Sequence, residues 1–290
     1  MAFELIEFRT DDGVQTNGYI NKCDKKTDKV LIQTHGMTGN CFKNREKTIS
    51  REVEKIGVDA ICFNNRGSEI VKYIKYFEEK KELAGMAYEN IEDSYYDIVG
   101  AIKYAVKLGY TKIYLQGHSL GSTKVVYTYN RMKKENNDLL KYIKGIVLLS
   151  LVDVANLLKK VTKKEYLDYA NEKESKGQVL ELMPDKTFFH PISIKTFLKY
   201  VKYNEDIDFA QYGNDDFEFE TLNNIEVPLF MRWGNVREMI EREADDQVNF
   251  MNNKIKNANK DIDYIDGANH SYDNREEQLA NQISNFIKKC

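Results

Sequence analysis

The five residues Gly117-His118-Ser119-Leu120-Gly121 have the types and spacing that could turn a serine into a nucleophile. They follow the apolar run Ile113–Leu115 and precede a helical pattern, so the sequence predicts a strand, a tight turn and a helix with Ser119 at the apex. A turn this sharp leaves no room for side chains two positions before and after the serine, so glycine is required there. The pattern predicts a nucleophile elbow and serine-based hydrolysis.

A serine hydroxyl needs a base to remove its proton, and histidine suits that task near neutral pH. The chain has four histidines. His118 is expected to point away from the serine into the packed flank of the elbow, His35 ends a predicted strand, and His190 lies in an aromatic segment. His270 follows the last predicted strand, and a loop at the carboxyl end of a parallel sheet can reach the elbow. By elimination and by place, we expect His270 to be the base; the alternative is a surface histidine without a chemical role.

Two backbone N–H groups are expected to hold the oxyanion that forms during acyl transfer. One belongs to Leu120, directly after the nucleophile and at the positive end of its helix. The second is expected from the loop His35–Asn40, whose glycines let the main chain turn toward the site, and Met37 is the predicted donor. The alternative interpretation of this loop is a plain glycine-rich turn.

Short apolar runs alternate with helical patterns along the chain, which is typical of a largely parallel sheet covered by helices. The apolar runs are Val30–Thr34, Ala60–Phe63, Ile113–Leu115, Ile146–Leu149, Leu229–Met231 and Tyr264–Ile265. Two earlier runs, Phe3–Arg9 and Gln15–Asn21, flank the turn signal Asp11-Asp12-Gly13 and predict an antiparallel hairpin at the edge. The predicted fold class is α/β, with eight strands in a mostly parallel sheet flanked by helices.

The alternation stops between about Val154 and Asn224, where charged helical stretches are mixed with prolines and aromatic residues. These aromatic residues are Phe188, Phe189, Phe197, Tyr200, Tyr203, Phe209 and Phe217. We interpret residues 154–224 as a cap, or lid, inserted after the sixth predicted strand, and residues 1–153 and 225–290 as the core. The alternative is two or three crossover helices, but connections in compact domains are far shorter, with a median of about 4–6 residues.

Composition excludes several classes of protein. The chain has 290 residues and is 42% hydrophobic, which is enough for a substantial globular core. The net charge of −3 combines 43 basic with 46 acidic residues, so no nucleic-acid groove is expected. The first residues lack a basic segment followed by an apolar one, and no apolar run has membrane-spanning length, so a cytoplasmic protein without a membrane partner is expected.

The four cysteines, Cys23, Cys41, Cys62 and Cys290, lie far apart without C-x-x-C spacing. Free thiols and no structural zinc are therefore expected, and Cys41 and Cys62 are interpreted as buried packing residues. No metal or organic cofactor is expected, because acyl transfer from a serine needs none.

Taken together and in order, four segments resemble the α/β-hydrolase superfamily over roughly residues 14–288. The segments are His35-Gly36, Asn65-Arg66-Gly67, Gly117-His118-Ser119-Leu120-Gly121 and Gly267-Ala268-Asn269-His270. The resemblance implies that Arg66-Gly67 is a structural turn that frames the site rather than a catalytic element. More narrowly, Gly85-Met86-Ala87-Tyr88-Glu89, the stretch Ser122–Tyr127, and Leu182-Met183-Pro184 look like a branch of bacterial and fungal hydrolases that includes siderophore-esterase-like proteins.

The sequence departs from the superfamily at the acid that should orient the histidine. That acid commonly stands in a G-x-x-D pattern after the seventh strand, but Arg237 occupies the position here, and a guanidinium cannot stabilise an imidazolium. Glu238 follows directly and is the first choice; Asp153, after the sixth predicted strand, is the second. Each has a structural alternative, since Glu238 could begin a helix and Asp153 could cap one. A dyad with a weak or absent acid is a further alternative.

These residues predict a two-step acyl transfer to Ser119 on a small-molecule ester. A thioesterase, or a hydrolase of peptide-like or siderophore-like natural products, is the second hypothesis. The aromatic residues of the predicted cap favour an apolar or aromatic acyl group, although packing of the cap explains them equally well. From a different class, a non-catalytic binding protein on the hydrolase fold is kept open by Arg237. The sequence does not reveal the oligomeric state.

Overall fold

The computed structural model describes residues 3–76, 80–202 and 204–290; Tyr203, one of the aromatic residues of the predicted cap, lies outside them. The strands are β1 (Phe3–Arg9), β2 (Gln15–Asn21), β3 (Lys29–Thr34), β4 (Asp59–Phe63), β5 (Lys72–Lys75), β6 (Lys81–Ala84), β7 (Lys112–His118), β8 (Ile143–Leu149), β9 (Leu229–Gly234) and β10 (Lys260–Ile265). Among the described residues, no helix is both long enough and apolar enough to cross a membrane.

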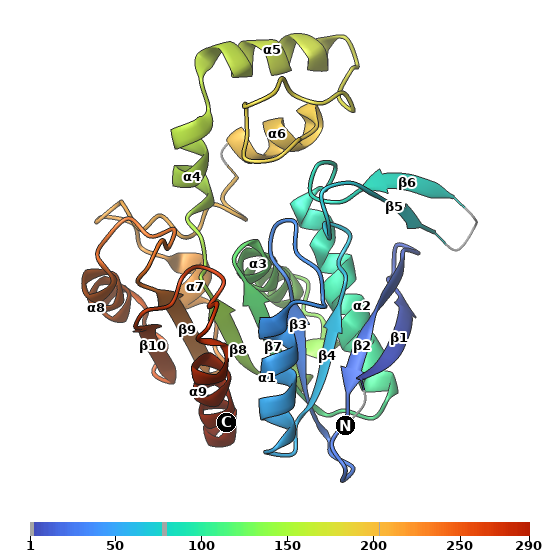
Figure 1. The fold of residues 1–290 in the computed structure, drawn as a ribbon, viewed down its shortest axis with the longest axis vertical. Helices are drawn as coiled ribbons and strands as arrows, with labels where there is room; N and C mark the ends of the chain where they lie inside the picture. The colour runs from blue at the N-terminus through green and yellow to red at the C-terminus, as the bar shows by residue number, and fades with distance from the viewer. Residues whose placement is uncertain (1–2, 77–79, 203) are drawn as a thin grey trace.

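Eight of these strands form one sheet in the order β1-β2-β4-β3-β7-β8-β9-β10 (Figure 1). Strands β1 and β2 form the predicted antiparallel hairpin, and β2 also pairs antiparallel with β4. From β4 to β10 every neighbouring pair is parallel. The predicted mostly parallel eight-stranded sheet is therefore confirmed, and the carboxyl ends of its six parallel strands meet at one edge.

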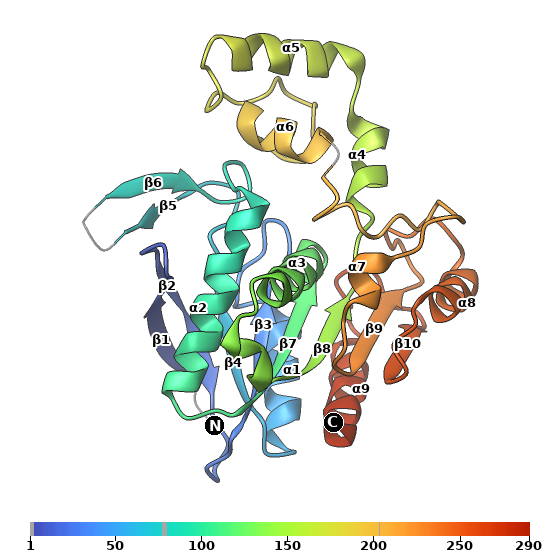
Figure 2. The same cartoon turned by 180° about the vertical axis from the view of Figure 1, so that it is seen from behind.

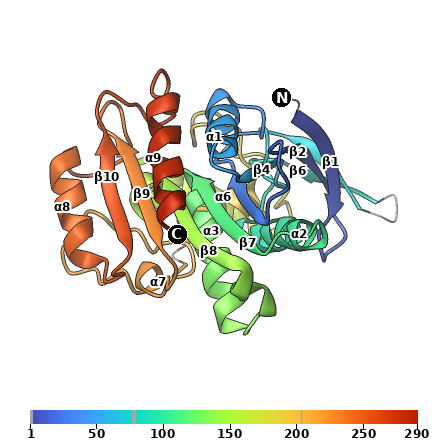
Figure 3. The same ribbon diagram turned by 90° about the horizontal axis from the view of Figure 1, so that it is seen from below.

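The helices are α1 (Asn44–Glu54), α2 (Ser94–Lys107), α3 (Leu120–Lys134), α4 (Val154–Val161), α5 (Lys164–Ser175), α6 (Ile194–Val201), α7 (Glu220–Asn223), α8 (Ala244–Lys254) and α9 (Glu276–Lys289), with short 3-10 turns at Ile91–Asp93 and Asp138–Tyr142. Helices α1 and α9 cover one face of the sheet, whereas α2, α3 and α8 pack on the other (Figures 1, 2 and 3). Each face buries its own hydrophobic cluster, so the sheet is held between two apolar layers.

Strands β5 and β6 form a separate two-stranded antiparallel sheet that was not predicted. Both strands are short and rich in charged residues, so they lack the apolar run that predicts the other strands. The hairpin is fixed by a small apolar cluster in which Ile74 and Ala84 pack against Val14. Tertiary packing, rather than strand propensity, explains this element.

Helices α4, α5 and α6 lie beyond the carboxyl ends of the parallel strands, apart from the two layers that cover the sheet (Figures 1 and 2). They share a hydrophobic cluster that also contains Leu120 and Met86 from the body of the protein. The later part of the β8–β9 segment, including Phe209 and Leu222, instead packs in the main core. The division into a core and a cap at residues 154–224 stays a prediction.

A buried ion pair joins helix α3 to this group of helices. Lys124 of α3 donates to Glu89 at 2.6 Å, and each side chain is only 1% exposed. The other carboxylate oxygen of Glu89 accepts from the hydroxyl of Tyr200 in α6 at 3.2 Å, and Lys124 also donates to Asn65 at 3.3 Å. A charge this deeply buried is tolerated because its partners stay in place.

Replacing Lys124 by Met should destabilise the protein strongly, because it leaves the Glu89 carboxylate buried without its counter-charge. We expect the free energy of unfolding to fall by about 3–5 kcal/mol, measured by urea denaturation followed by circular dichroism. Lys134→Met removes an exposed lysine from the same helix and serves as the matched control. Equal stability of the two variants would contradict the structural role of the pair.

Candidate active site

Ser119 stands at the junction where β7 ends at His118 and α3 begins at Leu120. Its backbone has φ 55° and ψ −126°, a strained conformation for a residue with a side chain. A Cβ added at Gly117 would lie 2.3 Å from the Gly121 carbonyl oxygen, and one at Gly121 would lie 2.3 Å from that of Thr34. The strand, turn and helix are as predicted, and main-chain contact explains both glycines.

The structure brings Ser119, His270 and Glu238 into one line of hydrogen bonds. The Ser119 hydroxyl lies 2.9 Å from His270 Nε2, and His270 Nδ1 contacts Glu238 Oε1. With the carboxylate ionised, Nδ1 carries the ring proton and Nε2 is free to accept from the serine. The exposed fraction is 18% for the His270 side chain and 2% for that of Glu238. These three residues are the sequence-predicted nucleophile, base and first-choice acid.

The carboxylate of Glu238 receives two further hydrogen bonds on its second oxygen. The backbone N–H of Gly234 donates at 2.9 Å, and the hydroxyl of Ser150 donates at 2.6 Å. Burial raises the pKa of Glu238, but the hydrogen bonds from His270, Ser150 and Gly234 outweigh it and hold the pKa below its usual value. Glu238 is therefore ionised at neutral pH even though water scarcely reaches it.

The loop after β9 places Glu238, and not the preceding Arg237, in contact with His270. Arg237 adopts a left-handed backbone conformation with φ 52°, is exposed and, in the described part of the chain, makes no ion pair with Glu238. The N–H groups of Asn235 and Val236 both donate to the carbonyl of Ala268, at 3.0 and 2.9 Å. These bonds tie the loop that carries Glu238 to the loop that carries His270.

Asp153, the second choice for the acid, is used elsewhere. Its two carboxylate oxygens accept from the backbone N–H groups of Asn156, at 3.0 Å, and Tyr212, at 3.1 Å. The first of these bonds caps the N-terminus of α4, which is the structural alternative considered for this residue. Burial raises the pKa of Asp153 despite these bonds.

Of the three remaining histidines, His190 lines a hollow together with Ser119, and the other two have local roles. His35 Nδ1 lies 2.9 Å from the Gly36 carbonyl, and its Nε2 accepts from the N–H of Asn65, so it joins two loops; burial lowers its pKa to about 3. His118 is buried beside the elbow, where Nε2 lies 2.7 Å from the His270 carbonyl oxygen. Burial also lowers the pKa of His118, so it stays neutral and supports the His270 loop.

The two predicted oxyanion donors lie beside the serine. Leu120 is the first residue of α3, so its N–H has no carbonyl one turn earlier in the helix. The N–H of Met37 donates to no other group within the described residues. A Cβ at Gly36 would lie 2.9 Å from that of Ser119, so a glycine is needed to bring the Met37 loop this close. The structure thus leaves both N–H groups available near the nucleophile.

Sequence reasoning missed the residues that support the acid. Ser150 directly follows β8 with φ 44°, and its Oγ lies 3.0 Å from the hydroxyl of Tyr272. The Tyr272 hydroxyl in turn donates to the Arg232 carbonyl at 2.8 Å. No motif marks these positions, because their contacts join strands and loops far apart in the sequence. The position of Ser150 at the carboxyl end of a strand was the only available signal.

Two hollows meet at the serine. One, of about 430 Å³, is bordered by the start of α1 and the loop after His270, and the other, of about 170 Å³, is bordered by α4 and the segment 188–190. Met37, Ser119 and His270 line both. Within the described residues, no group of three or more His, Cys, Asp or Glu side chains is arranged to hold a metal ion.

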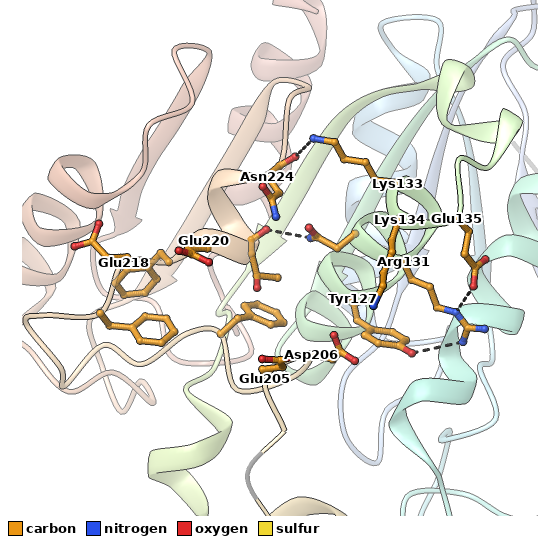
Figure 4. A pocket seen from close by; sticks show the side chains of 15 residues that line it. Tyr127, Arg131, Lys133, Lys134, Glu135, Glu205, Asp206, Glu218, Glu220 and Asn224 are labelled. Atoms are coloured by element: carbon orange, nitrogen blue, oxygen red, sulfur yellow. Dashed lines mark hydrogen bonds and ion pairs between the residues drawn. The ribbon is translucent and has the colours of Figure 1, made fainter.

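A third hollow, of about 990 Å³, lies between the end of α3 and the segment 205–224 and includes none of these three residues (Figure 4). Two of its three cations are engaged by neighbours: Arg131 pairs with Glu135 at 2.9 Å, and Lys133 donates to the Asn224 carbonyl at 3.1 Å. We therefore place the candidate active site at Ser119.

Comparisons with known proteins identify a family for this chain. A family model described as a protein of unknown function (DUF1749) matches residues 68–288. No curated protein matches the sequence closely enough to be counted.

Solved structures of low sequence identity share the fold over nearly the whole chain. Est1E from Butyrivibrio proteoclasticus, with ferulic acid bound, is 17% identical with a TM-score of 0.67, covering 97% of this chain and 98% of that one. The α/β-hydrolase GrgF from Penicillium sp. sh18 is 14% identical with a TM-score of 0.68, over 100% and 99%. Mouse α/β-hydrolase domain-containing protein 10 is 12% identical with a TM-score of 0.63, over 99% of each chain. The predicted α/β-hydrolase fold is confirmed.

Replacing Ser150 by Ala should raise the pKa of the Glu238 carboxyl, because the lost hydrogen bond favours the ionised form. The measurement is the pH titration of the Glu238 side-chain carboxyl carbon signal by NMR. Ser284→Ala removes another buried hydroxyl, one without a hydrogen-bond partner among the described residues, and should not move the titration. A titration that is unchanged, or shifted to lower pH, in Ser150→Ala would contradict this assignment.

Proposed function

Because this chain belongs to the family of proteins of unknown function DUF1749 and has the α/β-hydrolase fold, we propose that it is a serine hydrolase that cleaves ester bonds in small molecules. The observation that carries the proposal is the line of hydrogen bonds from Ser119 through His270 to Glu238. Each group has the neighbour that its role requires: the nucleophile has a base, and the base has a buried anion.

In the first step, Ser119 Oγ forms a bond to the ester carbonyl carbon while its proton passes to His270 Nε2. Glu238 stabilises the imidazolium that results and keeps the ring in the required orientation. The N–H groups of Met37 and Leu120 hold the carbonyl oxygen, which now carries the negative charge. When the carbon–oxygen bond to the alcohol breaks, the alcohol leaves with the proton from His270 Nε2.

In the second step, water takes the place of the alcohol. His270 Nε2 accepts a proton from the water as its oxygen bonds to the acyl carbon, and it returns that proton to Ser119 Oγ as the acyl–serine bond breaks. The products are the free carboxylic acid and the original enzyme. Every proton transfer uses a side chain of this protein, so the cycle needs no cofactor.

An ester substrate is favoured over the alternatives by two observations. The nucleophile is a serine with its base in hydrogen-bonding contact, which argues against a binding protein that has lost its chemistry. Est1E, which shares the fold, has been solved with ferulic acid, an aromatic carboxylic acid. Thioesters and the peptide-like or siderophore-like compounds suggested by the narrower sequence resemblance are the second candidate. They share the acyl-enzyme route and differ only in the leaving group.

We further propose that residues 154–224 act as a cap over the site. The position of α4 to α6 beyond the carboxyl ends of the strands supports this role (Figure 1). Leu157, Leu158 and Phe188 from this segment line the same hollow as Ser119, so the segment forms part of the site's wall.

A fluorophosphonate probe should react covalently with the folded protein, because it phosphonylates a serine only when a neighbouring base activates it. We expect labelling of the wild-type chain and none of Ser119→Ala, read by mass spectrometry of the intact protein. Ser122→Ala, one turn further along α3, is the matched control and should still be labelled. Absence of an adduct on folded wild-type protein, or an adduct that persists in Ser119→Ala, would refute the serine-hydrolase proposal.

Exchanging each candidate acid for its amide separates Glu238 from Asp153. Glu238→Gln keeps the shape but loses the charge that stabilises the imidazolium, and kcat on a nitrophenyl ester should fall by about 10⁴-fold. Asp153→Asn should retain most of the activity, because its carboxylate caps α4 instead. The assignment is wrong if only Asp153→Asn loses activity.

A further inference from the structure

The two hollows that meet at Ser119 differ in the polarity of their lining, and an ester has two parts to place, the acyl group and the alcohol. Given the proposed ester hydrolysis, we infer that the substrate joins a small apolar acid to a larger, polar alcohol rich in hydroxyl or amide groups. The acyl group occupies the hollow beside α4, and the alcohol occupies the hollow beside α1. The inference rests on the proposed function and adds to it the class of both products.

The hollow beside α4 is small and apolar. Its apolar walls are Val152, Val154, Leu157, Leu158, Phe188 and Phe189, and His190 and Tyr200 also line it. Its volume is about 170 Å³. An engineered protein cavity of about 150 Å³ binds benzene, so this hollow takes a single six-membered ring or a short aliphatic chain. A long fatty acyl chain would extend beyond it, past the exposed Phe189.

The two hollows leave one place for the acyl group once the alcohol is assigned. Leu120 lines the small hollow but not the larger one, and Met37 lines both, so a carbonyl oxygen held by their N–H groups lies where the hollows meet. With the alcohol directed to the larger hollow by the proton of His270, the acyl chain extends into the small one. The small hollow is therefore the acyl side.

The hollow beside α1 is larger, at about 430 Å³, and carries charge of both signs. Lys43 and Arg45 line it from the start of α1, and Asp273 and Glu276 line it from the loop and helix after His270. An apolar alcohol placed here would strip water from charged groups without replacing their hydrogen bonds. A polar alcohol can donate to the carboxylates and accept from the cations.

One side chain in this hollow has hydrogen-bonding capacity left for a ligand. The side chain of Lys43 is exposed and makes no ion pair or hydrogen bond within the described residues. Its ammonium group can therefore donate to an oxygen of the substrate. The neighbouring Arg45 guanidinium is only 7% exposed and already bonds Glu46 and the Ser271 carbonyl.

The proton delivered by His270 also favours this assignment. The leaving alcohol must receive a proton from His270 Nε2, so its oxygen has to lie on the side of the His270 loop. Ser271 and Asp273 from that loop line the larger hollow and not the smaller one. The group that leaves and the group that protonates it thus share one side of the serine.

The acyl side is tested with nitrophenyl esters of acetate, butanoate, octanoate and dodecanoate. We expect kcat/KM to be highest for a short acyl chain and to fall about tenfold or more by dodecanoate, a difference of about 1.4 kcal/mol. Phe189→Ala opens the exposed rim of the hollow and should raise the dodecanoate-to-butanoate ratio about tenfold. Leu180→Ala, an equally exposed residue of the same segment outside the hollow, is the matched control and should keep the wild-type ratio.

The alcohol side is tested with two esters of one acid, glycerol monobutanoate and hexyl butanoate. We expect kcat/KM to be about tenfold higher for the glycerol ester, and Lys43→Ala to lower that preference at least threefold. Lys47→Ala, one turn further along α1 and outside the hollow, should keep the wild-type preference.

Fluorophosphonate labelling of the same samples separates the inference from the proposed function. Protein that is labelled at Ser119 but prefers dodecanoate or hexyl esters, or whose preferences do not change in Phe189→Ala and Lys43→Ala, overturns the inference and leaves the serine hydrolase standing. Protein that is neither labelled nor active on any of these esters overturns both. The expected profile, with both variants shifting their own preference, supports the assignment of the two hollows.

Discussion

The close backbone contact at the elbow is the constraint on which the rest of the site depends. Gly117 and Gly121 bring β7, α3 and the end of β3 within main-chain distance of one another. Because no side chain separates them, Ser119 is held in a strained conformation that points its hydroxyl toward the loops at the carboxyl ends of the strands. Parallel pairing then places the His270 and Glu238 loops at the same edge. The sheet thus brings the loops of the site together, and the elbow orients the Ser119 hydroxyl toward them.

The proposed base and acid are both held by groups that take no part in the proposed reaction. The carbonyl of His270 is held by His118, and the second carboxylate oxygen of Glu238 is held by Ser150 and the Gly234 N–H. These contacts cross between β7, β8 and β9 and the loop after β10. The geometry of Ser119, His270 and Glu238 therefore depends on the packing of the whole carboxyl edge of the sheet, and not on these three residues alone.

The sequence allowed prediction of those features whose cause is local. The elbow, the alternation of strands and helices and the place of His270 follow from spacing and periodicity, and the structure agrees with the predicted eight-stranded sheet and with the strand–turn–helix at Ser119. The choice between Glu238 and Asp153 was left open, because it depends on which carboxylate the folded chain turns toward the imidazole. The same reason explains why the β5–β6 hairpin and Ser150 were missed: their partners are distant in sequence, and their own composition carries no signal.

The buried contact between Tyr200, Glu89 and Lys124 has a mechanical consequence. The Glu89 carboxylate pairs with Lys124 of α3, the helix that begins directly after Ser119. It also accepts a hydrogen bond from the Tyr200 hydroxyl of α6, so α6 is tied to α3 through Glu89. Moving α6 away would take the Tyr200 hydrogen bond from a carboxylate that is only 1% exposed, so a displacement of α6 is disfavoured. We therefore expect substrate and product to pass beside α4 or through the hollow beside α1. Access to Ser119 thus depends on the fixed position of α6 as well as on the residues that surround the serine.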